Sequence, residues 1–123
     1  MKTLTLQDLT HDELLAWIET AVLARFLPGR IVRQADLLSL RHATLQAKAQ
    51  ETSTARHAAA QASDAAWDAA RREKLGTRRR AEADLAHVKA EAAYRRAVRA
   101  DQKADAEAEA CWAALEAEWE RKR

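Results

Sequence analysis

The sequence predicts an all-α protein in which a short N-terminal helix packs on the base of a long antiparallel two-helix coiled-coil hairpin. The 123 residues include 31 alanines and no asparagine, and 33% are charged, so residues with high helix propensity dominate. The strong helix breakers, Pro28 with Gly29 and then Gly76, divide the chain into three segments. Small and apolar residues recur at a spacing of three to four in the two long segments, as expected for packed helices.

Residues 11–27 form the first predicted helix. Thr10 is a favourable N-cap, and Glu13 follows three residues later, so the two complete a capping box. The apolar residues of this segment gather on one wide face and comprise Leu14, Leu15, Trp17, Ile18, Val22, Leu23 and Phe26. Such a face must be covered, and we expect it to pack on the base of the hairpin.

Residues 31–75 and 77–122 form the two arms of the predicted hairpin, and with the first helix they make one domain of residues 1–123. Gly76 is expected to end the first arm as a left-handed C-cap, and Thr77 is expected to cap the second arm. Because a connection this short joins antiparallel neighbours, the arms should lie side by side.

Alanine dominates the predicted seam between the arms. The seam positions are Ala55, Ala59, Ala62, Ala66 and Ala69 on the first arm, and Ala83, Ala86, Ala90, Ala93, Ala97, Ala100, Ala104, Ala108, Cys111 and Leu115 on the second. Alanine lets helices approach closely but buries little apolar area. The larger residues are expected to pack at the two ends: Trp67 opposite Leu85, near Leu75 and Val88, at the tip, and Leu37, Leu38, Leu40 and Leu45 facing Trp112, Leu115 and Trp119 at the base.

The sequence lacks the motifs of enzymes and metal sites. The four histidines have no partner at a zinc-binding spacing, and neither a phosphate-binding loop nor a nucleophile motif occurs. We therefore expect no enzyme activity, no catalytic residue, no metal and no cofactor. The single cysteine favours a reducing, cytoplasmic location. The most apolar run, residues 14–27, is too short and too interrupted by charge to span a membrane.

Positive charge concentrates in residues 71–80, which hold six basic side chains and one acidic side chain. Three of the basic residues end the first arm, where they complement the helix dipole, whereas the other three begin the second arm, where they oppose it. A local rule broken in this way indicates function. The six side chains predicted to bind a partner protein with an acidic surface are Arg71, Arg72, Lys74, Arg78, Arg79 and Arg80.

The aromatic residues of the first helix and the base form a second candidate surface. A domain of this size rarely buries several tryptophans completely, so some of them can anchor a partner or a second copy. Because the alanine seam buries little area, and because twofold dimers are the commonest closed assembly, we expect a homodimer. The candidate anchors are Trp17, Phe26, Trp112 and Trp119.

These observations favour a non-enzymatic helical protein–protein interaction module that acts as an adaptor or an inhibitor. The Ala- and Arg-rich composition is typical of a GC-rich bacterial genome, a phage or another mobile element. A nucleic-acid-binding protein that uses the Arg-rich tip is the second alternative, since the tip can neutralise several phosphates. The third is a structural stalk: the two long segments resemble the two-helix stalk proteins of flagellar and type III secretion ATPases, and this resemblance implies an antiparallel coiled-coil rod.

Overall fold

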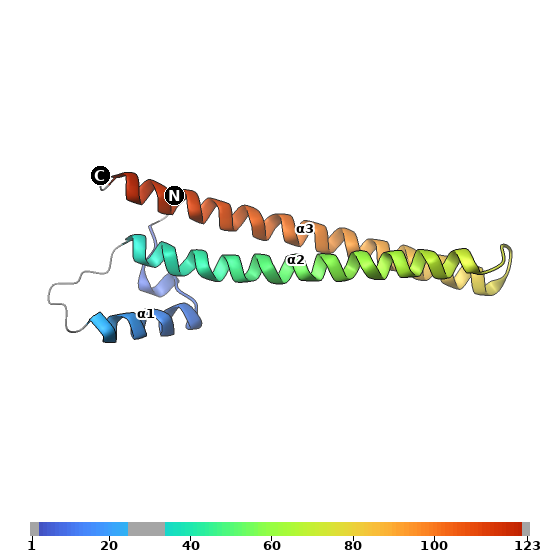
Figure 1. Ribbon diagram of the computed structural model, residues 1–123, viewed down its shortest axis with the longest axis horizontal. Coiled ribbons are helices and arrows are strands. Elements are labelled where there is room, and N and C mark those ends of the chain that lie inside the picture. Colours follow the sequence, from blue (N-terminus) through green and yellow to red (C-terminus); the bar gives the residue numbers. More distant parts are fainter. Residues whose placement is uncertain (1–2, 25–33, 122–123) are drawn as a thin grey trace. The chain divides into compact units, whose positions relative to one another are not determined.

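The structure, a computed structural model, describes residues 3–24 and 34–121, with the side chains of residues 3–18 and 34–121. Its elements are the 3₁₀ turn η1 (Leu6–Asp8) and the helices α1 (His11–Ala24), α2 (Gln34–Arg72) and α3 (Arg78–Arg121). The described residues contain no strand, and α2 and α3 run side by side from their connecting turn (Figure 1). The predicted all-α hairpin is confirmed.

Both long helices are shorter than the arms predicted from the sequence. Helix α2 ends at Arg72 and α3 begins at Arg78, so five residues form the connection in place of Gly76 alone. At the other end of the chain, α1 is described to Ala24. Residues 25–27 of the predicted first helix, Phe26 among them, lie outside the described residues.

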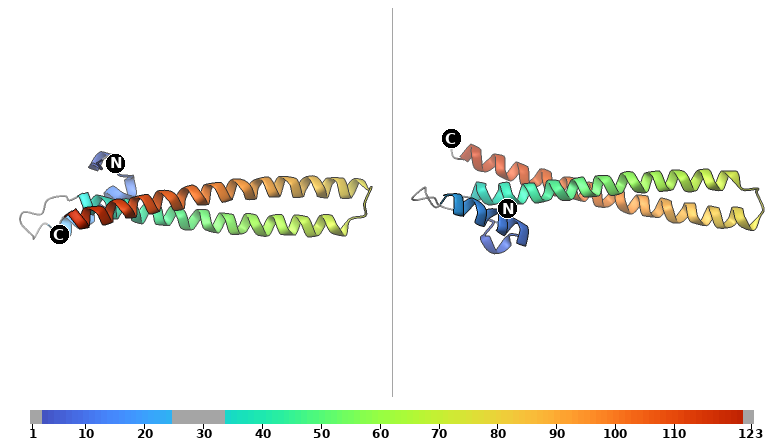
Figure 2. Two further views of the ribbon diagram at one scale, coloured as in Figure 1. Left: turned by 90° about the horizontal axis from the view of Figure 1, so that it is seen from above. Right: turned by 60° about the horizontal axis from the view of Figure 1, so that its bottom comes forward.

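The chain packs as two compact units, each of which contains antiparallel parts of α2 and α3 (Figure 2). The base unit comprises Met1–Ala47 and Asp105–Arg123, and the tip unit comprises Lys48–Ala104. The organisation of the chain as a single domain stays a prediction.

A strict heptad spacing defines the interface between the helices of the tip unit. The interior positions, all of them buried or half-buried, are Ala49, Thr52, Arg56, Ala59, Ser63, Ala66 and Ala70 of α2, and Ala83, His87, Ala90, Tyr94, Ala97, Asp101 and Ala104 of α3. Steps of three and four alternate without interruption, which is the pattern of a left-handed coiled coil. Small residues occupy most layers, so the helices can approach closely.

At alternate positions along α2, the residue that faces the interior is the one that directly follows the predicted seam residue. Ala55, Ala62 and Ala69 are exposed, and the interior positions next to them are Arg56, Ser63 and Ala70. On α3, Ala86 and Ala100 are likewise exposed, whereas His87 and Asp101 face the interior. At four of these five positions the prediction favours an alanine over the polar residue that lies in the interior, and at Ala69 the interior residue is another alanine. The interior accepts polar residues here because several of them bind one another across the interface.

In the base unit, the N-terminal segment is joined to α2 by polar contacts. The Gln34 side chain and the Leu4 backbone exchange two hydrogen bonds, at 2.8 and 2.9 Å. Arg41 of α2 donates from Nε to Glu13 Oε2 at 3.1 Å, and from Nη2 to the carbonyl oxygen of Asp8. The placement of the first helix on the base of the hairpin is therefore confirmed.

The predicted capping box at the start of α1 is also present. The Thr10 N–H donates to Glu13 Oε1 at 2.8 Å, and the Glu13 N–H donates to Thr10 Oγ1 at 3.3 Å. Glu13 thus caps α1 with one carboxylate oxygen and binds Arg41 with the other. This double use explains why the carboxylate tolerates burial, with only 1% of its side chain exposed.

The apolar core of the base unit is small. Leu38, Cys111 and Leu115 are buried together, with Leu4, Ala35, Leu45 and Ala114 packed against them. Leu37 is buried as well. Trp112 and Trp119 do not join this core. Trp112 directly follows the interior residue Cys111, and Trp119 lies one heptad later, so both occupy the flank of the interface. Both tryptophans are exposed, and the Trp112 ring lies 5.1 Å from the ring of His42 on α2.

Candidate functional site

The connection between α2 and α3 is a type II β-turn. The Thr77 N–H donates to the Lys74 carbonyl oxygen at 3.3 Å, and Gly76 has a φ of +80° at the third position of the turn. This position requires a positive φ, which glycine adopts without strain. Gly76 therefore shapes a turn beyond the end of α2 and is not its C-cap. The N-cap prediction is confirmed, since the Arg80 N–H donates to Thr77 Oγ1 at 3.2 Å.

Two of the three arginines at the start of α3 have acidic partners one turn along the helix. Arg78 Nε lies 3.1 Å from Glu82 Oε1, and Arg80 Nε lies 3.0 Å from Asp84 Oδ1. Arg80 also donates to the carbonyl oxygen of Glu73 at 3.4 Å, and its side chain is only 18% exposed. These ion pairs compensate locally for the unfavourable position of Arg78 and Arg80 in the helix dipole.

The other four basic residues around the turn are free to bind a partner. Arg71, Arg72, Lys74 and Arg79 are exposed, and none of their side chains has an ion pair or hydrogen bond within the described ranges. We call these four side chains the free cations. The structure therefore divides the six predicted contact residues into two that bind the chain itself and four that do not.

Exposed apolar side chains accompany the free cations in the tip unit. Trp67, Leu75, Leu85 and Val88 are exposed, and the Trp67 ring lies 5.2 Å from the His87 ring. On α3, Val88 directly follows His87, and Leu85 lies about one helical turn before Val88. On α2, Arg71 lies about one helical turn after Trp67. We call Trp67, Arg71, Leu85 and Val88 the tip face. The sequence predicts Trp67 opposite Leu85, near Leu75 and Val88, with these apolar residues packed at the tip. All four are exposed, and the ring that Trp67 contacts is that of His87.

A buried polar layer lies farther along the tip unit. Asp101 is 5% exposed, and its carboxylate accepts from Thr52 Oγ1 at 3.1 Å and from Arg56 Nη1 at 3.2 Å. The hydrogen bond to Asp101, followed by one to Tyr94, raises the pKa of Arg56 above its ordinary value. The layer is satisfied internally, so it determines helix register rather than ligand binding.

In the base unit, α3 exposes a stripe of acidic and aromatic side chains. Asp105, Glu109, Trp112, Glu116 and Trp119 follow each other at alternate steps of four and three, and all are exposed. We call these five residues the base stripe. The Trp112 and Trp119 rings meet edge to face at 5.6 Å, and Trp112 Nε1 donates to Glu116 Oε1 at 2.7 Å. Of the other predicted anchors, Trp17 is half-buried.

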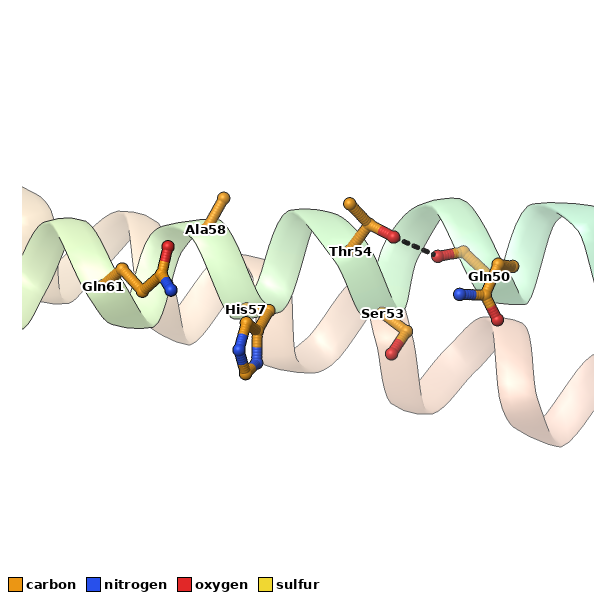
Figure 3. Close-up of a pocket in the computed structure, with 6 residues that line it drawn as sticks. All are labelled: Gln50, Ser53, Thr54, His57, Ala58 and Gln61. Atoms are coloured by element: carbon orange, nitrogen blue, oxygen red, sulfur yellow. Dashed lines mark hydrogen bonds between the residues drawn. The ribbon is translucent and has the colours of Figure 1, made fainter.

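The described residues offer little that resembles a catalytic or metal site. A shallow hollow on α2 is lined by Gln50, Ser53, Thr54, His57, Ala58 and Gln61, all from this one helix (Figure 3). No group of three metal-ligating side chains occurs in the described ranges. Cys111 is buried, and burial raises the pKa of its thiol above the ordinary value, against the opposing effect of Arg41.

The tip face and the base stripe each combine exposed aromatic side chains with charge. Sequence reasoning identified the basic turn but missed the aromatic part of the tip face; the signal for it was the heptad register, which places Trp67 on the flank. Within residues 3–24 and 34–121, no helix is long and apolar enough to cross a membrane. No protein-family profile, curated protein or solved structure matches this chain.

Proposed function

We propose that this protein is a helical interaction module that binds a protein partner with an acidic surface through the tip face and the free cations. The observation that carries this proposal is the joint exposure of Trp67, Leu85 and Val88 beside four basic side chains that have no partner in the described part of the chain. Binding occupies the partner's surface, as in an adaptor or an inhibitor, and involves no chemical step.

The composition of this surface is that of an energetically important contact. Trp and Arg are enriched among the residues that dominate binding energy, particularly where an apolar centre is surrounded by polar groups. The tip unit contains 13 basic and 8 acidic residues, a net charge of +5. This charge accelerates the encounter with an acidic partner, and the exposed indole supplies apolar area once contact is made.

A crosslinking experiment identifies the partner. A photoreactive residue placed at Trp67 is expected to capture it in cells of the source organism, whereas the same residue at Ala58, an exposed position on the outer surface of α2, should not. Binding of the purified partner is then measured with two variants. The first changes Arg71, Arg72, Lys74 and Arg79 to Gln, and the control changes Arg96, Arg99 and Lys103 to Gln.

We expect the first variant to bind at least about tenfold more weakly than the control at physiological salt, and Trp67→Ala to weaken binding further. All variants should remain helical, because the changed side chains are exposed. Equal affinities of the tip variant and the control variant would refute the role of the tip.

Nucleic-acid binding is the second candidate, and one observation favours it. Trp67 is exposed one helical turn from Arg71, and an aromatic ring beside basic side chains is the arrangement on which single-stranded bases stack. Binding to a random single strand should then weaken steeply with salt, and Trp67→Ala should abolish the part that salt does not remove. A salt titration without measurable binding at 50 mM salt excludes this candidate. The stalk reading gains no specific support.

A further inference from the structure

The two units of the chain carry opposite net charges. The base unit contains 8 basic and 11 acidic residues, a net charge of −3, against +5 for the tip unit. The acidic side chains of the base unit include Asp105, Glu109 and Glu116, which share the base stripe with two tryptophans. The chain itself therefore presents an acidic, aromatic surface of the kind that the tip face is proposed to bind.

The two surfaces also match in spacing. On α2 of the tip unit, Arg71 follows Trp67 by four residues, and on α3 of the base unit, Glu109 precedes Trp112 by three residues. Ridges of side chains at these spacings pack when two helices cross at a small angle. In an antiparallel arrangement with Trp67 against Trp112, Arg71 faces Glu109. A tip face laid along a base stripe thus brings rings onto rings and cations onto carboxylates.

Desolvation of the exposed indoles supports such a contact. Trp67, Trp112 and Trp119 are 45%, 41% and 45% exposed. A tryptophan can bury up to about 250 Å², so three half-exposed rings on each of two copies contribute roughly 600 Å². That is about half of the smallest area, roughly 1,200 Å², that a stable interface buries. Leu85, Val88 and the stems of the charged side chains supply further area.

We infer that the acidic partner of the tip face is the base stripe of a second copy of this chain. Twofold symmetry makes each copy contribute one tip face and one base stripe, so the dimer has two equivalent contacts and is closed. This mode differs from the base-to-base pairing expected from the sequence, which would bring two acidic surfaces together. The inference rests on the proposed function, because it names the partner of the same tip face.

Charge reversal provides the test. One variant carries Asp105→Lys and Glu109→Lys on the base stripe, and a second carries Arg71→Glu and Lys74→Glu near the turn. A third, the control, carries Arg96→Glu and Lys103→Glu, which make the same charge change elsewhere on the tip unit. Light scattering and sedimentation report the mass of each protein, and circular dichroism verifies that each stays helical.

The wild-type chain and the control should form dimers, whereas each reversal alone should raise the dissociation constant at least about tenfold. An equimolar mixture of the two reversed variants should form a heterodimer, because both of its contacts again join opposite charges. High salt should dissociate the wild-type dimer.

Three outcomes would overturn the inference: a wild-type chain that is monomeric at every concentration, a tip-reversed variant that dimerises like the control, or a mixture that gives no heterodimer. Open chains of growing mass would overturn the closed dimer. A monomeric wild type whose tip still binds a captured acidic partner would leave the proposed function intact, so the two failures are distinguishable.

Discussion

Replacing Arg41 by alanine is expected to release the N-terminal segment of the base unit from α2. The guanidinium group binds the Glu13 carboxylate at 3.1 Å and the carbonyl oxygen of Asp8. The Glu13 side chain is 1% exposed and the Arg41 side chain 27% exposed. The substitution therefore leaves a carboxylate buried without its cation, which is more damaging than the loss of a surface ion pair.

The magnitude follows from these contacts. Removing one partner of a buried ion pair costs about 3–5 kcal/mol. Glu13 keeps its hydrogen bond from the Thr10 N–H at 2.8 Å, and water can enter beside the partly exposed Arg41 position. We therefore expect the lower end, about 3 kcal/mol, which corresponds to a change of about 150-fold in the equilibrium between docked and released segment.

Hydrogen exchange at the amides of α1 measures this equilibrium directly. Protection of α1 should fall by about 150-fold in the Arg41→Ala protein, while protection in the tip unit should not change. The matched control is Arg95→Ala, which removes an exposed pair with Glu91 and should change stability by less than about 0.5 kcal/mol. An Arg41→Ala protein with wild-type protection of α1 would refute the reasoning.

Three further outcomes are expected. Gly76→Ala should lower the free energy of unfolding by about 1–2 kcal/mol in thermal melts, because its φ of +80° strains any side chain even though no atom lies within 4 Å of the added Cβ. Asp101→Leu combined with Arg56→Leu should leave the protein as stable or more so, but with more than one helix register in disulfide-trapping experiments. Because burial raises the pKa of Cys111, the contribution of this thiol to stability should be constant below the ordinary thiol value of 9.0 and should be lost as pH rises above it. Denaturant titrations of the wild-type and Cys111→Ala proteins should therefore differ in their pH dependence only above that value.

Helix punctuation explains why the fold could be predicted. Pro28, Gly29 and Gly76 are rare breaks in a chain of strong helix formers, so the number and order of helices follow from the composition and from the positions of these breaks. The capping box of Thr10 and Glu13 was equally readable, because both partners lie within four residues. Local signals of this kind need no knowledge of the tertiary structure.

The interior of the coiled coil could not be predicted in the same way. Alanine and polar residues alternate along these arms, so hydrophobic spacing favours the alanine of each neighbouring pair, and this displaces Ala55 and its equivalents by one position. The correct register depends on the contact between Arg56 and Asp101, and these two residues lie 45 positions apart in the chain. The sequence likewise could not distinguish the four free cations from Arg78 and Arg80, because the ion pairs of those two with Glu82 and Asp84 are seen only in the structure.

The small residues of the tip unit have a consequence for the order in which the protein folds. The buried apolar cluster of Leu38, Cys111 and Leu115 lies in the base unit, where the Cys111 thiol donates to the Leu38 carbonyl oxygen across 73 residues of chain. Closing so long a loop directly carries an entropic cost that grows with its length. Pairing of the arms outward from the turn shortens that loop one layer at a time. We therefore expect folding to begin at the turn, so that the weakly apolar layers set the rate and the base core sets the final stability.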